Sequence, residues 1–85
     1  MNNAEILVKL SKCKLIPTAE LSGYYHFRGE GKEIARMADW CWSKKIRPFH
    51  RDTNAGEIRV NMESVDNYLE TKEKGFMTGA RTGIL

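Results

Sequence analysis

The sequence predicts a small α+β domain, mainly helical, in which a two-stranded hairpin separates two amphipathic helices. Three observations lead to this prediction. Apolar residues recur at helical spacing from Lys32 to Lys44 and again after Asn61. Between them, two short alternating runs flank the turn-forming segment Asp52–Gly56. The chain has 85 residues, 41% of them hydrophobic, so one domain with one modest core is expected.

The N-terminal third of the chain gives weaker signals. Residues from Ala4 to Leu10 fit helical spacing and strand alternation equally well, so the type of this element stays open. Pro17 disfavours helix at the residue before it, and Thr18 is a suitable N-cap. A first helix is therefore predicted from about Thr18 to Tyr25. The two glycines of Arg28–Gly31 predict a turn after it.

A second helix is predicted from about Lys32 to Lys44. Its buried stripe consists of Ile34, Met37, Ala38 and Cys41. Lys44 and Lys45 oppose the negative end of the helix dipole, and Pro48 prevents continuation. Trp40 is nearer in phase to the stripe and is assigned to the core, whereas Trp42 is expected to be partly exposed.

The hairpin is predicted to pair the runs Phe49–Arg51 and Glu57–Val60. Alternation places Ile58 and Val60 toward the core and Arg59 toward solvent.

Asn61 is a good N-cap for a last helix from Met62 to about Lys74, with Gly75 as its stop. The buried stripe of this helix consists of Met62, Val65 and Leu69. The domain is expected to span residues 1–75, with the role of 1–14 open, and residues 76–85 to form a flexible tail.

Motifs of enzymes, cofactor sites and metal sites are absent from the sequence. Gly29 and Gly31 lack the third glycine and the lysine of a phosphate-binding loop. The two cysteines and two histidines are too scattered for a metal site or a nucleophile pattern. No apolar run is long enough for a membrane span, and no secretory signal is visible. We expect a cytoplasmic protein that is not an enzyme, has no cofactor or metal, and does not enter a membrane.

Positive charge is concentrated in the middle of the chain. The net charge is +3 and the sequence pI is about 9.0. Seven Lys and Arg residues lie between Lys32 and Arg59 against four acidic residues, a surplus of three that equals the charge of the whole chain. This balance permits nucleic-acid binding without establishing it.

The pattern predicts three groups of DNA contacts. Lys32, Arg36 and Asp39 face away from the apolar stripe and are candidates to enter a major groove, with Arg36 the best candidate to recognise guanine. The hairpin adds His50, Arg51, Asn54 and Arg59 for an adjacent minor groove. Backbone contacts are assigned to Lys44, Lys45 and Arg47. The alternative for each helix residue is a solvated face.

The segments Trp40–Pro48, Glu57–Val60 and Met62–Leu69 resemble the MerR-like winged helix-turn-helix of phage excisionases, or recombination directionality factors. The resemblance covers about the central half of the chain. It implies a winged helix-turn-helix with a two-stranded wing and a C-terminal helix. It places helix contacts on Lys32, Glu33, Arg36 and Asp39, and wing contacts on Arg51, Asn54 and Arg59. The segment Tyr24–Gly31 is longer than the tight turn usual between the family's first two helices.

The resemblance also implies a function. Such a protein binds and bends double-stranded attachment-site DNA in the cytoplasm of a bacterial host. It self-associates on the DNA and directs a tyrosine integrase toward excision of a phage or mobile element. The alternatives are a phage transcriptional regulator using the same surface, or a protein-interaction module that uses Trp42, Tyr24 and the tail.

Overall fold

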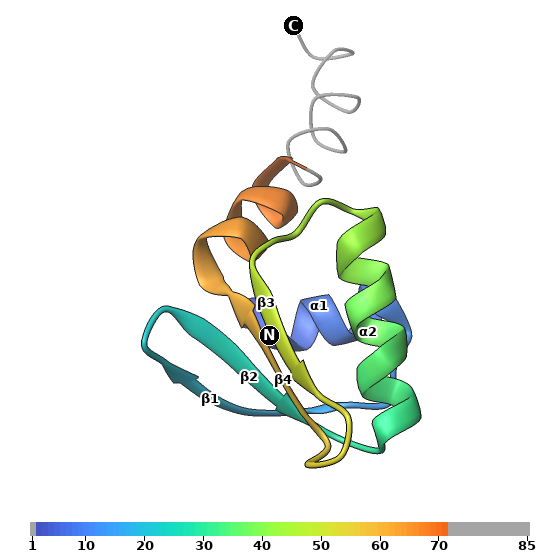
Figure 1. Ribbon diagram of the computed structural model, residues 1–85. Coiled ribbons are helices and arrows are strands. Elements are labelled where there is room, and N and C mark those ends of the chain that lie inside the picture. The colour runs from blue at the N-terminus through green and yellow to red at the C-terminus, as the bar shows by residue number, and fades with distance from the viewer. Residues whose placement is uncertain (1, 72–85) are drawn as a thin grey trace, which may run out of the picture.

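The computed structural model describes residues 2–71, which form an α+β fold of three helices and one four-stranded antiparallel sheet (Figure 1). The elements in chain order are α1 (Asn3–Ser11), β1 (Ile16–Leu21), β2 (Tyr24–Arg28), α2 (Gly31–Ser43), β3 (Phe49–Asp52), β4 (Glu57–Asn61) and a helix at 62–71. The strands lie in the order β1-β2-β4-β3. The predicted α+β class is confirmed.

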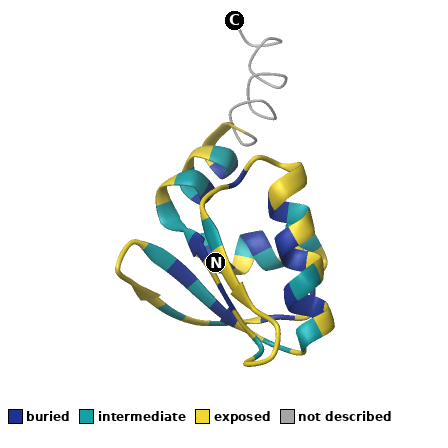
Figure 2. Cartoon of the chain, in the orientation of Figure 1, coloured by how far each residue is buried: buried dark blue, intermediate teal, exposed yellow. Residues whose placement is uncertain are grey.

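In the described part of the chain, the helices pack on one face of the sheet. Buried residues alternate with partly or fully exposed ones along β2 and β4 (Figure 2). The inward residues are Tyr25, Phe27, Ile58 and Val60, and they join the apolar side chains of the helices in a single core. The opposite face has no helix on it in the described part of the chain, and we call it the open face.

The N-terminal segment, for which the sequence allowed a helix or a strand, forms the helix α1. Its capping residues explain why it is a helix. The Glu5 backbone N–H donates to Asn2 Oδ1 at 2.9 Å, and the Asn2 N–H donates to Glu5 Oε1 at 3.4 Å. This capping box satisfies two backbone donors at the helix start. Ala4 and Leu7 are buried in the core, so α1 is an integral part of the domain.

The helix predicted from Thr18 to Tyr25 is wrong, because this segment forms the β1–β2 hairpin. Its turn consists of Ser22 and Gly23, both with positive φ, at 54° and 81°. Two-residue turns with positive φ at both positions match the twist of antiparallel strands and favour a hairpin. Pro17 is tolerated because β1 is an edge strand.

This correction bears on the predicted winged helix-turn-helix, which is not confirmed. A helix-turn-helix needs two helices joined by a turn of about three to four residues. Within residues 2–71, α1 ends at Ser11 and α2 begins at Gly31, with a whole hairpin between them. The hairpin accounts for the unusual length of Tyr24–Gly31.

The central elements follow the prediction closely. The stripe Ile34, Met37, Ala38 and Cys41 of α2 is buried, and β3 and β4 form the predicted hairpin. Trp40 is partly buried against the core, with its ring edge-to-face to Tyr68 at 5.8 Å between centroids. Trp42 is 61% exposed.

The last helix begins as predicted. The Ser64 backbone N–H donates to Asn61 Oδ1 at 2.8 Å, which makes Asn61 the predicted N-cap. Of the predicted stripe, Val65 and Leu69 are buried, and Met62 is partly buried against the core. The predicted end near Lys74, the stop at Gly75 and the tail at 76–85 lie outside the described residues.

One carboxylate joins three separate parts of the fold. Asp66 Oδ1 accepts from the Tyr25 hydroxyl at 2.6 Å and from Asn3 Nδ2 at 2.8 Å. Burial and the bond to Asp66 raise the pKa of Tyr25 to about 12. Because Asp66 bonds both α1 and β2, it fixes the last helix against the rest of the domain.

Candidate nucleic-acid interface

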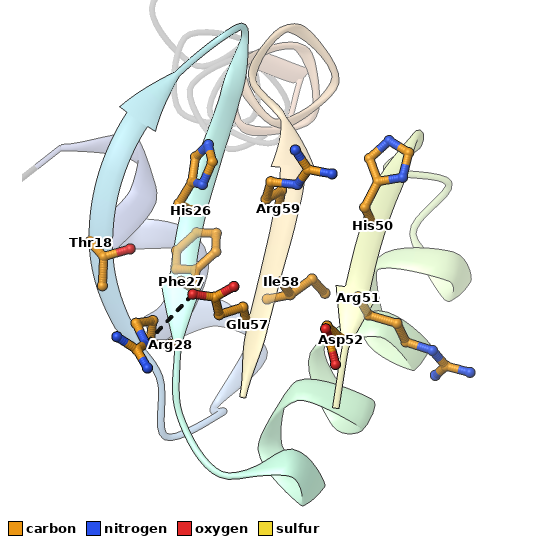
Figure 3. A pocket seen from close by; sticks show the side chains of 10 residues that line it. All are labelled: Thr18, His26, Phe27, Arg28, His50, Arg51, Asp52, Glu57, Ile58 and Arg59. Carbon is orange, nitrogen blue, oxygen red and sulfur yellow. Dashed lines mark ion pairs between the residues drawn. The ribbon is translucent and has the colours of Figure 1, made fainter. Parts of the chain in front are cut away.

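The strand registers place side chains of the open face in rows that cross the sheet. Directly paired residues of antiparallel strands point to the same face. One such row is His26, Arg59 and His50, from β2, β4 and β3, and we call it the basic row. Figure 3 shows the three side chains side by side above the sheet. The next row along, on the same face, consists of Arg28, Glu57 and Asp52.

Tyr24 connects two members of the basic row. The Arg59 guanidinium carbon lies 5.7 Å from the centroid of the Tyr24 ring. The Tyr24 hydroxyl lies 3.4 Å from His50 Nε2, and the two rings meet at an angle of 63°. His26 is positioned separately, with its Nε2 3.3 Å from the Leu21 carbonyl oxygen. The ring of Tyr24 therefore links the guanidinium of Arg59 to the imidazole of His50.

The row of Arg28, Glu57 and Asp52 has a different charge. Arg28 Nε lies 3.9 Å from Glu57 Oε1, and Asp52 Oδ1 accepts the Ala55 N–H at 3.0 Å in the β3–β4 turn. Charge is therefore segregated along the open face. Among residues 2–71, Arg59 has no acidic partner and lies toward the start of β3, whereas both carboxylates and the paired Arg28 lie toward the β3–β4 turn.

The loop between α2 and β3 continues the basic end of the sheet. The Asn61 N–H donates to the Pro48 carbonyl oxygen at 3.0 Å, so the chain is already beside β4 when β3 begins. Three exposed cations precede that point: Lys44, Lys45 and Arg47. Within residues 2–71, none of these three, nor Arg51 or Arg59, has an acidic side chain within 4.0 Å.

The exposed face of α2 is different, because its cations have acidic neighbours. Lys32 Nζ lies 3.6 Å from Glu30 Oε2, and Arg36 lies 3.2 Å from Glu33 Oε2. Asp39 is exposed and adds a negative charge to this face. The cations of α2 are therefore poorer candidates for phosphate contacts than those of the sheet.

Glu33 is a structural residue. It is 4% exposed, and its Oε1 accepts the Lys14 backbone N–H at 2.8 Å. That hydrogen bond and the nearby Arg36 hold the pKa of the Glu33 carboxyl below its usual range. The expected contact between Glu33 and DNA is therefore not available to this side chain.

The predicted hairpin contacts divide between surfaces. His50 and Arg59 lie on the open face, whereas Arg51 pairs with the inward Ile58 and lies on the edge strand β3 (Figure 3). Asn54 is exposed in the β3–β4 turn. Since α2 packs on the covered face, its exposed cations and the basic row point in different directions.

The predicted DNA contacts did not include Tyr24 and His26, because Tyr24 lies in the segment predicted as a helix and His26 directly follows it. The signal that identifies them is Ser22–Gly23, a two-residue turn between runs that alternate in polarity.

The described residues give no sign of a metal site, a membrane span or a reactive thiol. Within 2–71, no group of three or more His, Cys, Asp and Glu side chains is arranged to hold a metal ion. Over the same residues, no helix combines the length and apolar character needed to cross a membrane. Cys13 and Cys41 are both buried and unbonded, and burial raises the pKa of the Cys41 thiol to about 12.

Comparison with known proteins adds no further assignment. No protein-family model, no curated protein and no solved structure matches this chain.

Proposed function

We propose that this chain binds double-stranded DNA through the basic row and the α2–β3 loop. The observation that carries the proposal is the segregation of charge on the open face. At one end of it, Arg59 has no acidic partner among residues 2–71 and lies near the unpaired cations of the α2–β3 loop, and DNA phosphates are the natural counter-charge. Arg59 lies at the centre of the basic row, between two imidazoles that supply further hydrogen-bonding groups.

An antiparallel sheet is a suitable shape for this ligand. The major groove admits a two-stranded ribbon as well as a helix, and several DNA-binding folds use strands in a groove. In this arrangement Arg59 recognises a base edge or a phosphate from β4. Lys44, Lys45 and Arg47 contact the backbone beside it. The surface of α2 that carries Arg36 is then a solvated face.

The finer proposal is an architectural role in excision, and it is supported by the resemblance described above. The order of α2, the β3–β4 hairpin and the helix at 62–71 agrees with that resemblance. In this role several copies bind and bend attachment-site DNA and direct a tyrosine integrase toward excision. Transcriptional regulation through the same surface is the alternative.

Binding is tested by gel shift, using attachment-site DNA and an unrelated duplex, with two matched variants. We expect Arg59→Ala to weaken duplex binding by about tenfold, the effect of losing one good arginine contact. Arg36→Ala removes a cation from α2 and should change binding by less than about threefold. The reverse ranking would assign recognition to α2 and overturn the sheet proposal.

The excision role is tested separately. A circular-permutation assay measures bending of the bound site. An excision reaction with a tyrosine integrase and its attachment sites then measures directionality. Bending together with stimulated excision supports the architectural role, whereas binding without either supports a regulator.

A further inference from the structure

Trp42 is a large apolar side chain left open to solvent. It is 61% exposed, at the last turn of α2, whereas Trp40 two residues earlier is partly buried against Tyr68. Indole rings dominate the energetics of both cores and interfaces because they bury a large apolar area on contact. An exposed indole therefore has most of its contact area available to a ligand.

The stripe of α2 that ends in Trp42 faces the β3 side of the domain. Gly31, Ala35 and Ala38 precede Trp42 at spacings of three and four residues, which places the four on one flank of the helix. At the start of that flank, a Cβ atom on Gly31 would lie 2.8 Å from the Thr53 carbonyl oxygen, just beyond β3. Trp42 thus projects near the basic end of β3.

A guanidinium is already stacked on the indole. The Arg47 guanidinium carbon lies 4.4 Å from the centroid of the Trp42 ring. The loop that positions Arg47 is anchored, since Ile46 is 1% exposed and its N–H donates to the Cys41 carbonyl oxygen at 2.9 Å. Lys45, with a φ of 61°, turns the chain back toward the helix. The backbone that carries Arg47 is therefore held close to the end of α2.

The charge around this pair selects a polyanion. No acidic residue occurs from Trp40 to Arg51. In the same stretch Lys44, Lys45, Arg47 and Arg51 are all exposed. A ligand that suits both features has a flat aromatic group attached to a phosphate backbone. Aromatic side chains and arginine beside a cationic surface are the usual means of holding unpaired bases.

We infer that Trp42 and Arg47 form a stacking site for one unpaired nucleobase, with Lys44 and Lys45 contacting the adjacent phosphates. The base comes either from a single strand or from an extrahelical nucleotide in a distorted duplex. This site lies beside the basic row, and Trp42 is its new element. It rests in part on the proposed function, because Lys44, Lys45 and Arg47 of the α2–β3 loop belong to both.

The test is quenching of tryptophan fluorescence in the full chain, because a stacked base quenches indole emission. Four probes are titrated: a short single-stranded oligonucleotide, a duplex with one bulged nucleotide, the same duplex fully paired, and inorganic polyphosphate. We expect quenching by the single strand, by the bulged duplex or by both, and little by polyphosphate. Which of the two quenches identifies the source of the base.

Three variants complete the test. Trp42→Ala should abolish most of the quenching and weaken binding of the quenching probe by roughly tenfold or more. Trp42→Phe should retain part of the affinity, and Leu21→Ala, which removes another exposed apolar side chain, should have no effect. Arg47→Lys should weaken binding because it keeps the charge and loses the planar stack. Equal quenching by polyphosphate, or unchanged affinity in Trp42→Ala, would overturn the inference.

The result is separable from that of the proposed function. Arg59→Ala should reduce binding of the fully paired duplex and leave the quenching of Trp42 intact. If the wild-type chain does not bind the fully paired duplex but its tryptophan emission is quenched by the single strand or the bulged duplex, the basic row is contradicted as a duplex site and the stacking site is supported. If the wild-type chain binds the fully paired duplex and none of the probes quenches its emission, the duplex site is supported and the stacking site is contradicted.

Discussion

At the scale of single residues, Glu33 shows how an acidic side chain on a helix can serve the fold. Its carboxylate accepts from the Lys14 backbone and pairs with Arg36, and the segment that contains Lys14 connects α1 to β1. Glu33 therefore satisfies the Lys14 backbone N–H. As an acidic residue in the first turn of α2, it also interacts favourably with the positive end of the helix dipole. The family resemblance implied a DNA contact for Glu33, and local spacing does not reveal a distant backbone partner such as Lys14.

The first prediction concerns the dependence of stability on acid. Since the folded-state pKa of Glu33 is lowered, its contribution is present above its ordinary pKa of 4.5 and is lost as pH falls through the folded value. Glu33→Gln should therefore lower the urea midpoint at neutral pH, and the difference from wild type should shrink at about pH 3.

Glu30→Gln is the matched control for that experiment. Glu30 lies in an exposed pair with Lys32, so its replacement should leave the midpoint nearly unchanged at both pH values. Equal effects of the two substitutions would contradict the structural role of Glu33.

The second prediction concerns Tyr25. Its raised pKa, about 12 against an ordinary 10.0, means that its contribution to stability is complete below pH 10 and is lost between about pH 10 and 12. Tyr25→Phe removes the hydrogen bond to Asp66 and should lower the free energy of unfolding by about 1–3 kcal/mol at neutral pH.

Spectrophotometric titration of tyrosinate, together with urea unfolding across the same pH range, measures both effects. Cys41 has its raised pKa in an overlapping range, so the variant should retain part of the alkaline loss. A Tyr25 that titrates near pH 10 in the folded chain would contradict the hydrogen bond to Asp66.

At the scale of elements, the β1–β2 hairpin decides which surface of the molecule is available. It adds two strands to the predicted pair and creates the open face with Tyr24 and His26 on it. Its turn depends on Gly23, whose φ of 81° is costly for residues with a Cβ atom.

The third prediction tests that turn. No atom lies within 4 Å of a Cβ placed on Gly23, so Gly23→Ala should lower the free energy of unfolding by about 1–2 kcal/mol through backbone strain alone. Gly23→Asn should cost less, because asparagine tolerates this conformation. Urea unfolding of both variants checks the ranking, and equal stabilities would contradict the positive φ.

Elements with strong local signals were predictable from the sequence, and those without them were not. The apolar stripe of α2 and the turn residues of the β3–β4 hairpin lie within a few positions of each other, so spacing alone identifies them. Between Thr18 and Tyr25 the sequence contains two conflicting signals: Thr18 as an N-cap favours a helix, and Ser22–Gly23 as a two-residue turn favours a hairpin. The structure has the hairpin. For α1, apolar spacing fits a helix and a strand equally well, and the capping box of Asn2 and Glu5 favours the helix.

The candidate site was predictable only in part, for a related reason. Arg59 and His50 were identified because outward positions of a hairpin follow from alternation. Their alignment with His26 depends on the pairing of β2 with β4, which joins residues more than thirty positions apart. No local pattern reveals such a register.

At the scale of the whole molecule, two surfaces with different charge balance lie on different sides of one core. The open face and the α2–β3 loop carry four cations without acidic partners in the described residues: Lys44, Lys45, Arg47 and Arg59. Arg51, on the edge strand β3 beside them, is a fifth. The exposed side of α2 carries paired charges. In the proposed complex, this asymmetry turns the open face and the α2–β3 loop toward the nucleic acid and the exposed side of α2 away from it.

The fourth prediction follows from that asymmetry. Each neutralised phosphate contributes about −0.9 to the slope of log K against log salt. Lys44→Ala and Lys45→Ala should therefore each reduce the steepness of the slope for duplex DNA by about 0.9, and Lys32→Ala should leave it unchanged. Fluorescence anisotropy across a salt series measures the slopes, and a change for Lys32→Ala alone would contradict the proposed orientation.

The bond between Asn3 and Asp66 has a consequence for how the chain is made. The two residues are 63 positions apart, and the same carboxylate also holds Tyr25. During synthesis, α1 and the first hairpin leave the ribosome well before their shared acceptor exists. Their side-chain donors must then remain in water until nearly the whole domain has been translated. The helix at 62–71 therefore supplies the acceptor for both donors, and these two hydrogen bonds form only after that helix has been synthesised.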